Sequence, residues 1–470
     1  MTQEIFYLSA VELTEAIRAG RLSAREVMQA HLARIEQVNP KVNAIVTLHA
    51  EQALAAAAAA DEAQAQGKPL GALHGLPVAH KDLLATSGMR TTFGSKVHEH
   101  NVPKYSVLIV ERQQQAGAIS IGKTNTPEFG AGSQTFNAVF GATRNPYDLG
   151  MTCGGSSGGS AVALATGMVA LADGTDMGGS LRCPANYCNI VGLRPSVGRV
   201  PQVPAIDAWD TLSVSGPMAR TVEDLALYLS VIAGPDARDP LAIAEDGTRF
   251  RASLKQDMKG ARIAFAPTMG GLPVDRRVIA AIEAQRKVFE DLGCVVEDAW
   301  PDMRDAHEIF MTLRAHAFES RLGAVMDQHP GVLKDTVVWN IEEGRKLTGP
   351  KLARAAKLRT ALFKRMNEFM QRYDFLVLPV NQVPPFSIEQ AYITEIDGVK
   401  MESYIDWMRS CYLITATGHP ALSVPCAFTD DGLPVGLQIV GRHQGEMALL
   451  RMGFAFEQAT GVGQRRPAGL

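Results

Sequence analysis

The sequence predicts an α/β fold in which a single large domain is built on a mixed β-sheet core covered by helices on both faces. Three stretches indicate this fold. Short apolar strands alternate with a helix between residues 76 and 121, a strand, a helix and a strand follow one another over 262–297, and two strands precede a helix over 421–460. Such alternation is typical of a sheet that lies between helical layers. The 470 residues exceed an average domain, but large α/β enzymes often do so as one unit.

The chain is expected to contribute four parts to this fold. They are an N-terminal helical segment packed on the core (1–66), the core itself (67–300), a mainly helical portion (301–412), and C-terminal strands and a helix that complete the core (413–470). In the first part, a helix that begins after Ser23 is expected to end near Pro40. In the second, we expect a polar, proline-rich wrap over 190–225 and one helix over 275–292.

Composition narrows the functional class. Hydrophobic residues make up 46% and charged residues 20% of the chain, the balance of a soluble globular protein. The formal net charge is −3 and lysines and arginines do not cluster, so neither nucleic acid nor an anionic membrane is expected as a partner. The N-terminus lacks the apolar core of a signal peptide, and no apolar run reaches the length of a membrane span. We therefore expect a cytoplasmic protein.

The six cysteines are too sparse for a disulfide scaffold, and free thiols are expected. Cys183 and Cys188 are spaced closely enough to suggest a metal pair, but no second Cys or His pair at ligand spacing accompanies them. We therefore expect neither a metal nor another cofactor.

The chain is organised around Cys153 to Pro184. Two glycine-flanked serine clusters, at 154–160 and 178–180, bracket an uncharged run over 161–172 that is expected to form a buried helix followed by a buried strand. Glycine permits tight loops and close approach to a ligand. Each cluster offers serine hydroxyls beside backbone N–H groups, and acyl transfer needs a nucleophile and an oxyanion hole.

The serine nucleophile needs a base, and none of the eleven histidines lies within this stretch. Lys81 is the better candidate, because it ends a short apolar strand that begins at Leu76. Burial disfavours the ammonium form and lowers the pKa of a lysine, which makes it usable as a base near neutral pH. Serine with lysine is a known variant of the triad.

Three motifs, GLPVAHKD at 75–82, GGSSGGSA at 154–161 and GTDMGGSLRCPA at 174–185, resemble those of the amidase signature family of amide hydrolases. Further similarity lies at 123–128, 215–220 and 432–438. The resemblance implies a Ser–Ser–Lys triad with Ser180 as the nucleophile, Ser156 as a bridging serine after a cis peptide, and Lys81 as the base. It further implies an oxyanion hole formed by the backbone N–H groups of Met177, Gly178, Gly179 and Ser180.

The resemblance also implies how the substrate site is built. The loop over 130–137 lies beside the nucleophile in this family, so the expected acyl pocket residues are Phe129, Gly130, Ala131 and Phe136. Residues 67–300 then correspond to the amidase signature core, and 301–412 to the variable portion that shapes the substrate entrance. Candidates for the wall of that entrance are Trp339, Tyr404, Trp407 and Tyr412. Asp176 and Arg182 are expected to hold the nucleophile loop as an ion pair.

The expected function is hydrolysis of a carboxylic amide to acid and amine through a Ser180 acyl-enzyme. Aryl amides, aliphatic amides, carbamates and esters all remain open as substrates, and so does the oligomeric state, which is often a homodimer in the family. Nucleotide binding is disfavoured, because Gly159 is followed by Ser160 and not by the lysine of a P-loop. The alternative within the family is a glutaminyl-tRNA amidotransferase-like glutaminase subunit that acts in a complex. The stretch 358–365 lacks the paired-tyrosine, lysine-rich motif of that subunit, which favours a stand-alone hydrolase.

Overall fold

A computed structural model describes residues 4–470. Its main feature is an eleven-stranded sheet. In spatial order its strands are β1 (Ile45–Leu48), β3 (Ile119–Thr124), β2 (Pro77–Lys81), β6 (Leu171–Asp176), β8 (Val214–Ala219), β7 (Val191–Arg194), β14 (Ala421–Phe428), β15 (Pro434–Val440), β11 (Phe375–Pro379), β9 (Arg262–Phe265) and β10 (Val295–Asp298). The strand pairs β4 (Phe136–Asn137) with β5 (Gly141–Ala142) and β12 (Glu395–Ile396) with β13 (Val399–Lys400) form two small separate sheets.

The sheet is mixed. Strand β2 pairs in parallel with both β3 and β6, and β9 pairs in parallel with β10 and β11. Between these two parallel regions, β6, β8, β7, β14, β15 and β11 pair antiparallel. Strands drawn from the first fifth of the chain to its C-terminal part share this sheet, so the α/β fold is confirmed as a single domain with a mixed sheet.

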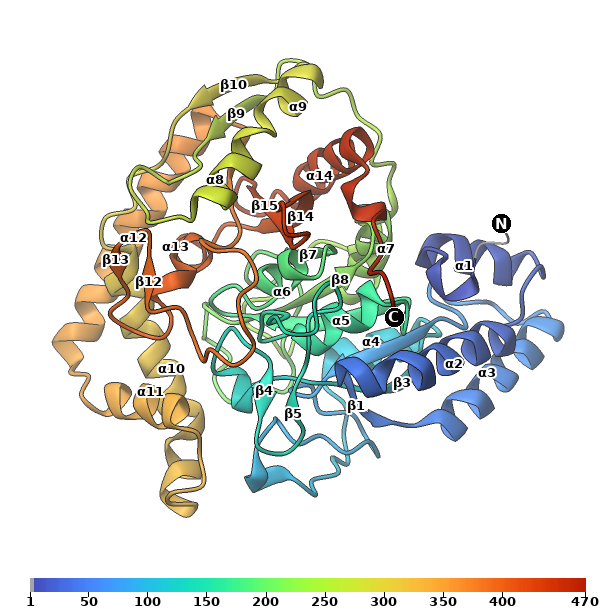
Figure 1. The fold of residues 1–470 in the computed structure, drawn as a ribbon. Coiled ribbons are helices and arrows are strands. Elements are labelled where there is room, and N and C mark those ends of the chain that lie inside the picture. The colour runs from blue at the N-terminus through green and yellow to red at the C-terminus, as the bar shows by residue number, and fades with distance from the viewer. Residues whose placement is uncertain (1–3) are drawn as a thin grey trace.

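Helices cover both faces of the sheet (Figure 1). Those described are α1 (Ala10–Arg18), α2 (Ala24–Val42), α3 (Ala50–Ala65), α4 (Leu108–Gln115), α5 (Gly158–Ala165), α6 (Arg182–Tyr187), α7 (Val222–Ile232), α8 (Arg276–Glu283), α9 (Arg286–Asp291), α10 (Ala306–Gln328), α11 (Asp335–Arg345), α12 (Gly349–Arg372), α13 (Arg409–Thr417) and α14 (Glu446–Thr460).

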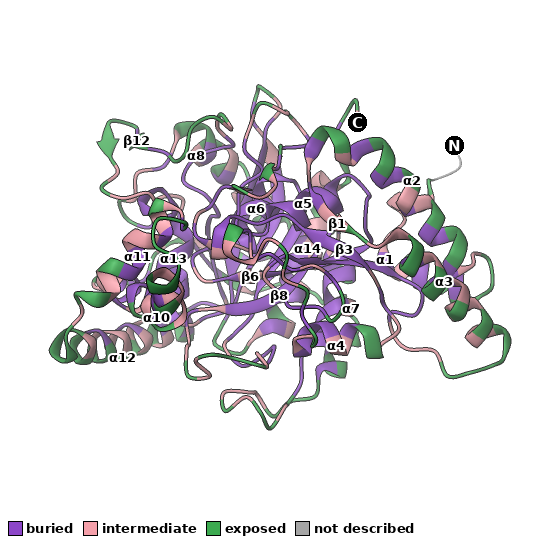
Figure 2. Ribbon diagram, turned by 90° about the horizontal axis from the view of Figure 1, so that it is seen from below, coloured by how far each residue is buried: buried purple, intermediate pink, exposed green. Residues whose placement is uncertain are grey.

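Alternate residues of the central strands pack into two different apolar clusters, one on each face of the sheet. Val78 of β2 and Leu171 of β6 pack into a cluster with α4, α7 and α14, whereas their neighbours Ala79 and Ala172 pack into another with α2, α3 and α5. This follows from the period of two in a strand, whose side chains point alternately to opposite faces. Because both faces are covered, the central strands are buried along almost their whole length (Figure 2).

Most elements match their predicted positions, and three differ. The expected wrap over 190–225 is wrong, because it contains β7 and β8 from the middle of the sheet and the start of α7. Helix α2 continues past Pro40 to Val42. The single helix expected over 275–292 is two helices, α8 and α9.

The ends of the molecule are helical. Helices α1, α2 and α3 lie at one end, and α10, α11 and α12 lie at the opposite end, as both ribbon views show (Figures 1 and 2). Among residues 4–470, no helix combines the length and the apolar character needed to cross a membrane.

Candidate active site

The predicted base stands at the carboxyl end of the parallel strand pair β2 and β6. Lys81 is the last residue of β2, and Thr175 and Asp176 are the last residues of β6. Because the two strands are adjacent and parallel, their carboxyl ends meet at one edge of the sheet. Ligands of α/β proteins commonly bind at such an edge.

Lys81 is fully buried among hydroxyl groups. Its Nζ lies 2.7 Å from Ser156 Oγ, 2.9 Å from Ser157 Oγ and 2.9 Å from Thr175 Oγ1. Burial lowers the pKa of Lys81 to about 7, against the smaller opposing attraction of Asp176 and Asp173. A substantial fraction of this amine is therefore neutral near pH 7 and able to accept a proton.

The strand that carries Lys81 is fixed by Asp173 on β6. The Lys81 backbone N–H donates to Asp173 Oδ1 at 2.8 Å, and His80 Nδ1 lies 2.6 Å from Asp173 Oδ2. Although burial opposes its ionisation, interaction with His80 keeps the pKa of Asp173 below its usual value. The histidine next to the predicted base is thus held by a carboxylate, on the side of the strand away from the lysine amine.

Ser156 and Ser157 occupy the loop immediately before α5. The peptide bond between Gly155 and Ser156 is cis, as the resemblance implies. The predicted buried helix and strand after this loop are confirmed as α5 and β6. Ser157 N–H donates to the carbonyl of Ser180 at 3.2 Å, which joins the two serine clusters directly. Ser180 is partly exposed, and within residues 4–470 its hydroxyl makes no hydrogen bond, so it is free to turn towards Ser156 or a substrate.

The loop that carries Ser180 is held by Asp176. Its carboxylate accepts from the N–H groups of Gly179 and Leu181, at 3.0 Å and 3.1 Å, and from the guanidinium of Arg182. Burial by itself would raise the pKa of Asp176, but Arg182 and Arg194 keep it well below its usual value. The expected structural role of the Asp176–Arg182 pair is confirmed.

The backbone donors predicted for the oxyanion hole are not equivalent. The Gly179 N–H is occupied by Asp176. In the described part of the chain, the N–H groups of Met177, Gly178 and Ser180 donate to no protein acceptor. Three of the four predicted donors are therefore available to a ligand.

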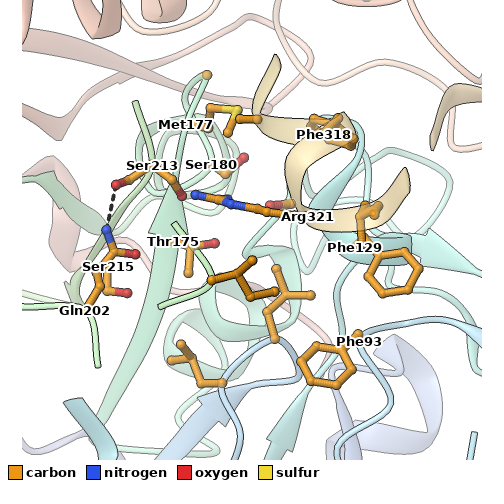
Figure 3. A pocket seen from close by; sticks show the side chains of 18 of the residues that line it. Phe93, Phe129, Thr175, Met177, Ser180, Gln202, Ser213, Ser215, Phe318 and Arg321 are labelled. Atoms are coloured by element: carbon orange, nitrogen blue, oxygen red, sulfur yellow. Dashed lines mark hydrogen bonds between the residues drawn. The ribbon is translucent and has the colours of Figure 1, made fainter. Parts of the chain in front are cut away.

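A cavity of about 460 Å³ opens in front of these groups. Ser156, Thr175, Gly178 and Ser180 form its reactive side. Much of the remaining lining is apolar and includes Leu83, Phe93, Phe129, Phe318, Leu322 and Val325. Figure 3 shows the three phenylalanines on the side of the pocket opposite Thr175, Ser213 and Ser215, with Arg321 extending across the space between.

Two of the four predicted acyl-pocket residues line this cavity. Phe129 and Gly130 do so, whereas Ala131 and Phe136 do not. Ala131 is fully buried in a separate apolar cluster with Phe318 and Val337. The ring of Phe136 instead lies 4.1 Å from the Lys334 ammonium.

None of the four aromatic residues expected at the entrance lines the cavity. Trp407 and Tyr412 are buried in a core cluster that also contains Phe310. Besides Phe129, the aromatic wall comes from Phe93, Phe310 and Phe318, which sequence reasoning missed. The helical spacing of Phe310, Phe318 and Leu322 on α10 was an available signal, but the same spacing also describes an ordinary core-facing helix.

The two cysteines considered as a metal pair make separate contacts. Cys183 Sγ accepts from Asn381 Nδ2 at 3.3 Å, and Cys188 Sγ donates to the carbonyl of Cys153 at 3.6 Å. Over residues 4–470, no group of three or more His, Cys, Asp or Glu side chains is arranged to hold a metal ion.

Comparison with known sequences points to one family. The profile of the Amidase family matches residues 26–450. The acylamidase of Rhodococcus erythropolis is 36% identical over 469 residues, covering 99% of this chain and 98% of the relative. A glutamyl-tRNA(Gln) amidotransferase subunit of Moorella thermoacetica is 35% identical over 489 residues, covering 99% of each.

Solved structures agree with this assignment. A bacterial aryl acylamidase of the amidase signature enzymes superposes with a TM-score of 0.91 at 30% identity, with 97% of each chain covered. The 6-aminohexanoate cyclic dimer hydrolase has a TM-score of 0.88 at 26% identity, covering 98% of this chain and 99% of the other. Sequence and fold together show that this chain belongs to the amidase signature family of amide-hydrolysing enzymes.

Proposed function

We propose that the chain is a stand-alone amidase in which Ser180 is the nucleophile, Ser156 the bridging serine and Lys81 the base. The observation that carries this proposal is the 2.7 Å contact between Lys81 Nζ and Ser156 Oγ. It joins a buried amine, whose pKa is about 7, to a hydroxyl on the same cavity as Ser180. A neutral amine at this position accepts a proton from Ser156 as Ser156 takes one from Ser180.

The attack forms a bond from Ser180 Oγ to the amide carbon and moves an electron pair onto the carbonyl oxygen. The N–H groups of Met177, Gly178 and Ser180 are the proposed donors to this oxyanion. Gly179 N–H points to Asp176 and fixes the loop. A donor of this kind contributes about 3 kcal/mol to transition-state stabilisation in other hydrolases.

The same relay then serves the leaving group. The Lys81 ammonium returns its proton through Ser156 to the amide nitrogen as the C–N bond breaks, because an amide anion is a poor leaving group. Water subsequently attacks the acyl-enzyme and releases the acid. The bridging serine is useful because it passes protons in both directions between a buried lysine and the substrate.

The apolar lining of the cavity supports aryl or medium-sized aliphatic acyl groups as substrates. The rings of Phe93, Phe129 and Phe318 provide flat surfaces against which such groups pack. The acylamidase and aryl acylamidase relatives favour the same substrate class.

The second candidate is the glutaminase component of a tRNA-dependent amidotransferase, which the similarity to the Moorella thermoacetica protein favours. Glutamine carries an α-ammonium and an α-carboxylate, and a buried site must compensate both charges. The described lining of the cavity contains two arginines but no aspartate or glutamate. This charge pattern argues against free glutamine as the substrate.

A hydrolysis panel tests the proposal. We expect turnover of 4-nitroanilides with aryl or aliphatic acyl groups, and loss of that turnover in Ser180→Ala with a nearly unchanged melting curve. Glutamine is included with carbamates and esters. Preferential glutamine hydrolysis, or co-purification of stoichiometric partner subunits from the native host, would support the amidotransferase alternative. Anilide turnover retained by Ser180→Ala would rule out the proposed nucleophile.

A further inference from the structure

Helix α10 places two arginines on the wall of the catalytic cavity. Arg314 and Arg321 are seven residues apart, two helical turns, and therefore share a face of the helix. Phe318 lies between them and also lines the cavity. The two side chains differ in how their charges are compensated.

Arg321 has a carboxylate partner. Its guanidinium forms an ion pair with Asp210 on the loop before β8. The Arg321 side chain is 30% exposed, and Figure 3 shows it crossing the pocket. It belongs to the outer part of the site, near Ile206, which is 78% exposed.

Arg314 is only 6% exposed, and no carboxylate of the described chain lies within ion-pair distance of it. Its neighbours are neutral. Nε donates to Asn340 Oδ1 at 3.0 Å, one Nη donates to the Tyr404 hydroxyl at 2.7 Å, and the other lies 3.4 Å from Met177 Sδ. A guanidinium has five N–H groups, so these contacts leave donors free on a side chain that lines the cavity.

A buried charge without a counter-ion is unfavourable, and proteins normally pair such a group. Arg314 is held in place by Asn340, Tyr404 and the ring of Phe318, whose centroid lies 4.6 Å from the guanidinium carbon. These contacts orient the cation but do not neutralise it. Because Arg314 also lines the cavity, a ligand carboxylate could supply the missing negative charge there.

We propose that the substrate carries a carboxylate on its acyl part and that Arg314 binds it. Two observations place the carboxylate on the acyl side. Arg314 touches Met177, at the start of the nucleophile loop, and is far more buried than Arg321 at the mouth. The acyl part stays bonded to Ser180 after the amine departs, so it occupies the inner end of the site. This inference rests on the proposed amidase function.

The first experiment uses the wild-type chain. We would compare the mono-4-nitroanilides of succinate, glutarate and adipate with neutral analogues in which a methyl ketone replaces each carboxylate. A charge-assisted hydrogen bond to a buried arginine predicts a kcat/KM for the best-fitting acid about tenfold or more above that of its neutral analogue. Equal or higher kcat/KM for every neutral analogue would overturn the inference.

The second experiment locates the preference. In Arg314→Met the ratio of acid to neutral kcat/KM is expected to fall to about one, and Arg314→Lys is expected to retain part of it because the charge remains. Arg321→Met is the matched control. It removes a cation from the same face of the helix, but the charge of Arg321 is already compensated by Asp210. A ratio unchanged in Arg314→Met, or lost equally in Arg321→Met, would contradict the assignment to Arg314.

A binding measurement separates this inference from the proposed chemistry. Calorimetry with Ser180→Ala needs no turnover, and we expect the best-fitting acid anilide to bind about tenfold tighter than its neutral analogue. Adding Arg314→Met should remove the difference. Tighter binding of the acid without wild-type turnover would reject the catalytic proposal and keep the binding site, whereas turnover without an acid preference would do the reverse.

Discussion

The carboxylate of Asp176 and the guanidinium of Arg182 form a fully buried two-point ion pair, with Oδ2 3.0 Å from Nε and Oδ1 2.9 Å from Nη2. The same carboxylate accepts the backbone N–H groups of Gly179 and Leu181, which flank Ser180 on either side. One buried anion thus fixes both the charge balance beneath the nucleophile loop and the path of its backbone.

Asp176→Ala is expected to lower the free energy of unfolding by about 3–5 kcal/mol, because it leaves the Arg182 charge buried without its partner. Amide turnover should be lost as the Ser180 loop relaxes. Urea denaturation measures the first effect. Glu245→Ala is the control, since Glu245 pairs with Arg199 at a position 44% exposed and is expected to change stability by about 1 kcal/mol at most. Similar stability of Asp176→Ala and the wild type would contradict the stabilising role assigned to the Asp176 carboxylate.

Substitution of Ser156 and of Ser157 tests which serine passes the proton to Lys81, because Lys81 Nζ lies within 2.9 Å of both hydroxyls. Only Ser156 lines the catalytic cavity. Ser156→Ala is expected to lower kcat by about 10³-fold or more, since it removes the proton path to Ser180.

Ser157→Ala removes one hydrogen bond to the lysine and should lower kcat only about fivefold, the equivalent of about 1 kcal/mol. Steady-state kinetics on one 4-nitroanilide checks both variants. The reverse order of effects would make Ser157 the bridging residue.

The reactive residues could be predicted from the sequence because each lies in a short, recognisable sequence pattern. A glycine-rich loop before a helix, a second one after a strand, and a lysine that ends an apolar strand each leave a short pattern. The parallel pairing of β2 and β6 brings Lys81 beside Thr175, whereas its contact with Ser156 also requires the loop before α5 to lie at this edge of the sheet. Thr175, the third hydroxyl on Lys81, was missed although it stands next to Asp176 on the same strand.

Strand β8 and the cavity wall could not be predicted in this way, because they depend on packing between segments that are distant in the sequence. Strand β8 was missed because it contains Gly216 and Pro217, and a proline argues against a central strand. Here Pro217 pairs with Asp173 in the antiparallel ladder to β6. The cavity wall likewise arises from α10, some 130 residues after Ser180, and no local pattern on that helix separates a pocket-lining arginine from a solvated one.

The pH dependence of kcat/KM reports on the base. Since the neutral amine of Lys81 accepts the proton and its pKa is about 7, kcat/KM is expected to fall about tenfold per pH unit below pH 7 and to level off above it. A neutral 4-nitroanilide avoids titration of the substrate.

His98 also lines the cavity, and partial burial lowers its pKa as well. His98→Gln should therefore leave the midpoint of the acid limb where it is in the wild type. A shifted or missing limb in His98→Gln would assign the titration to the histidine, and a flat wild-type profile down to pH 5 would exclude a lysine base.

His31 makes a separate prediction about stability. It is fully buried on α2, with Nδ1 3.0 Å from the carbonyl of Gly167. Burial, assisted by repulsion from Arg220, lowers its pKa to about 3, whereas an unfolded histidine titrates near 6.5. The unfolded state therefore binds the extra proton first, and the stability of the fold falls as the pH drops from about 6.5 towards 3. Between pH 7.5 and 5 this one group is expected to remove about 2 kcal/mol from the free energy of unfolding.

Urea denaturation at the two pH values should show a smaller loss of stability in His31→Gln than in the wild type. His100→Gln, at an exposed position, should behave as the wild type does. An equal loss in His31→Gln and the wild type would mean that other groups control the acid sensitivity of the fold.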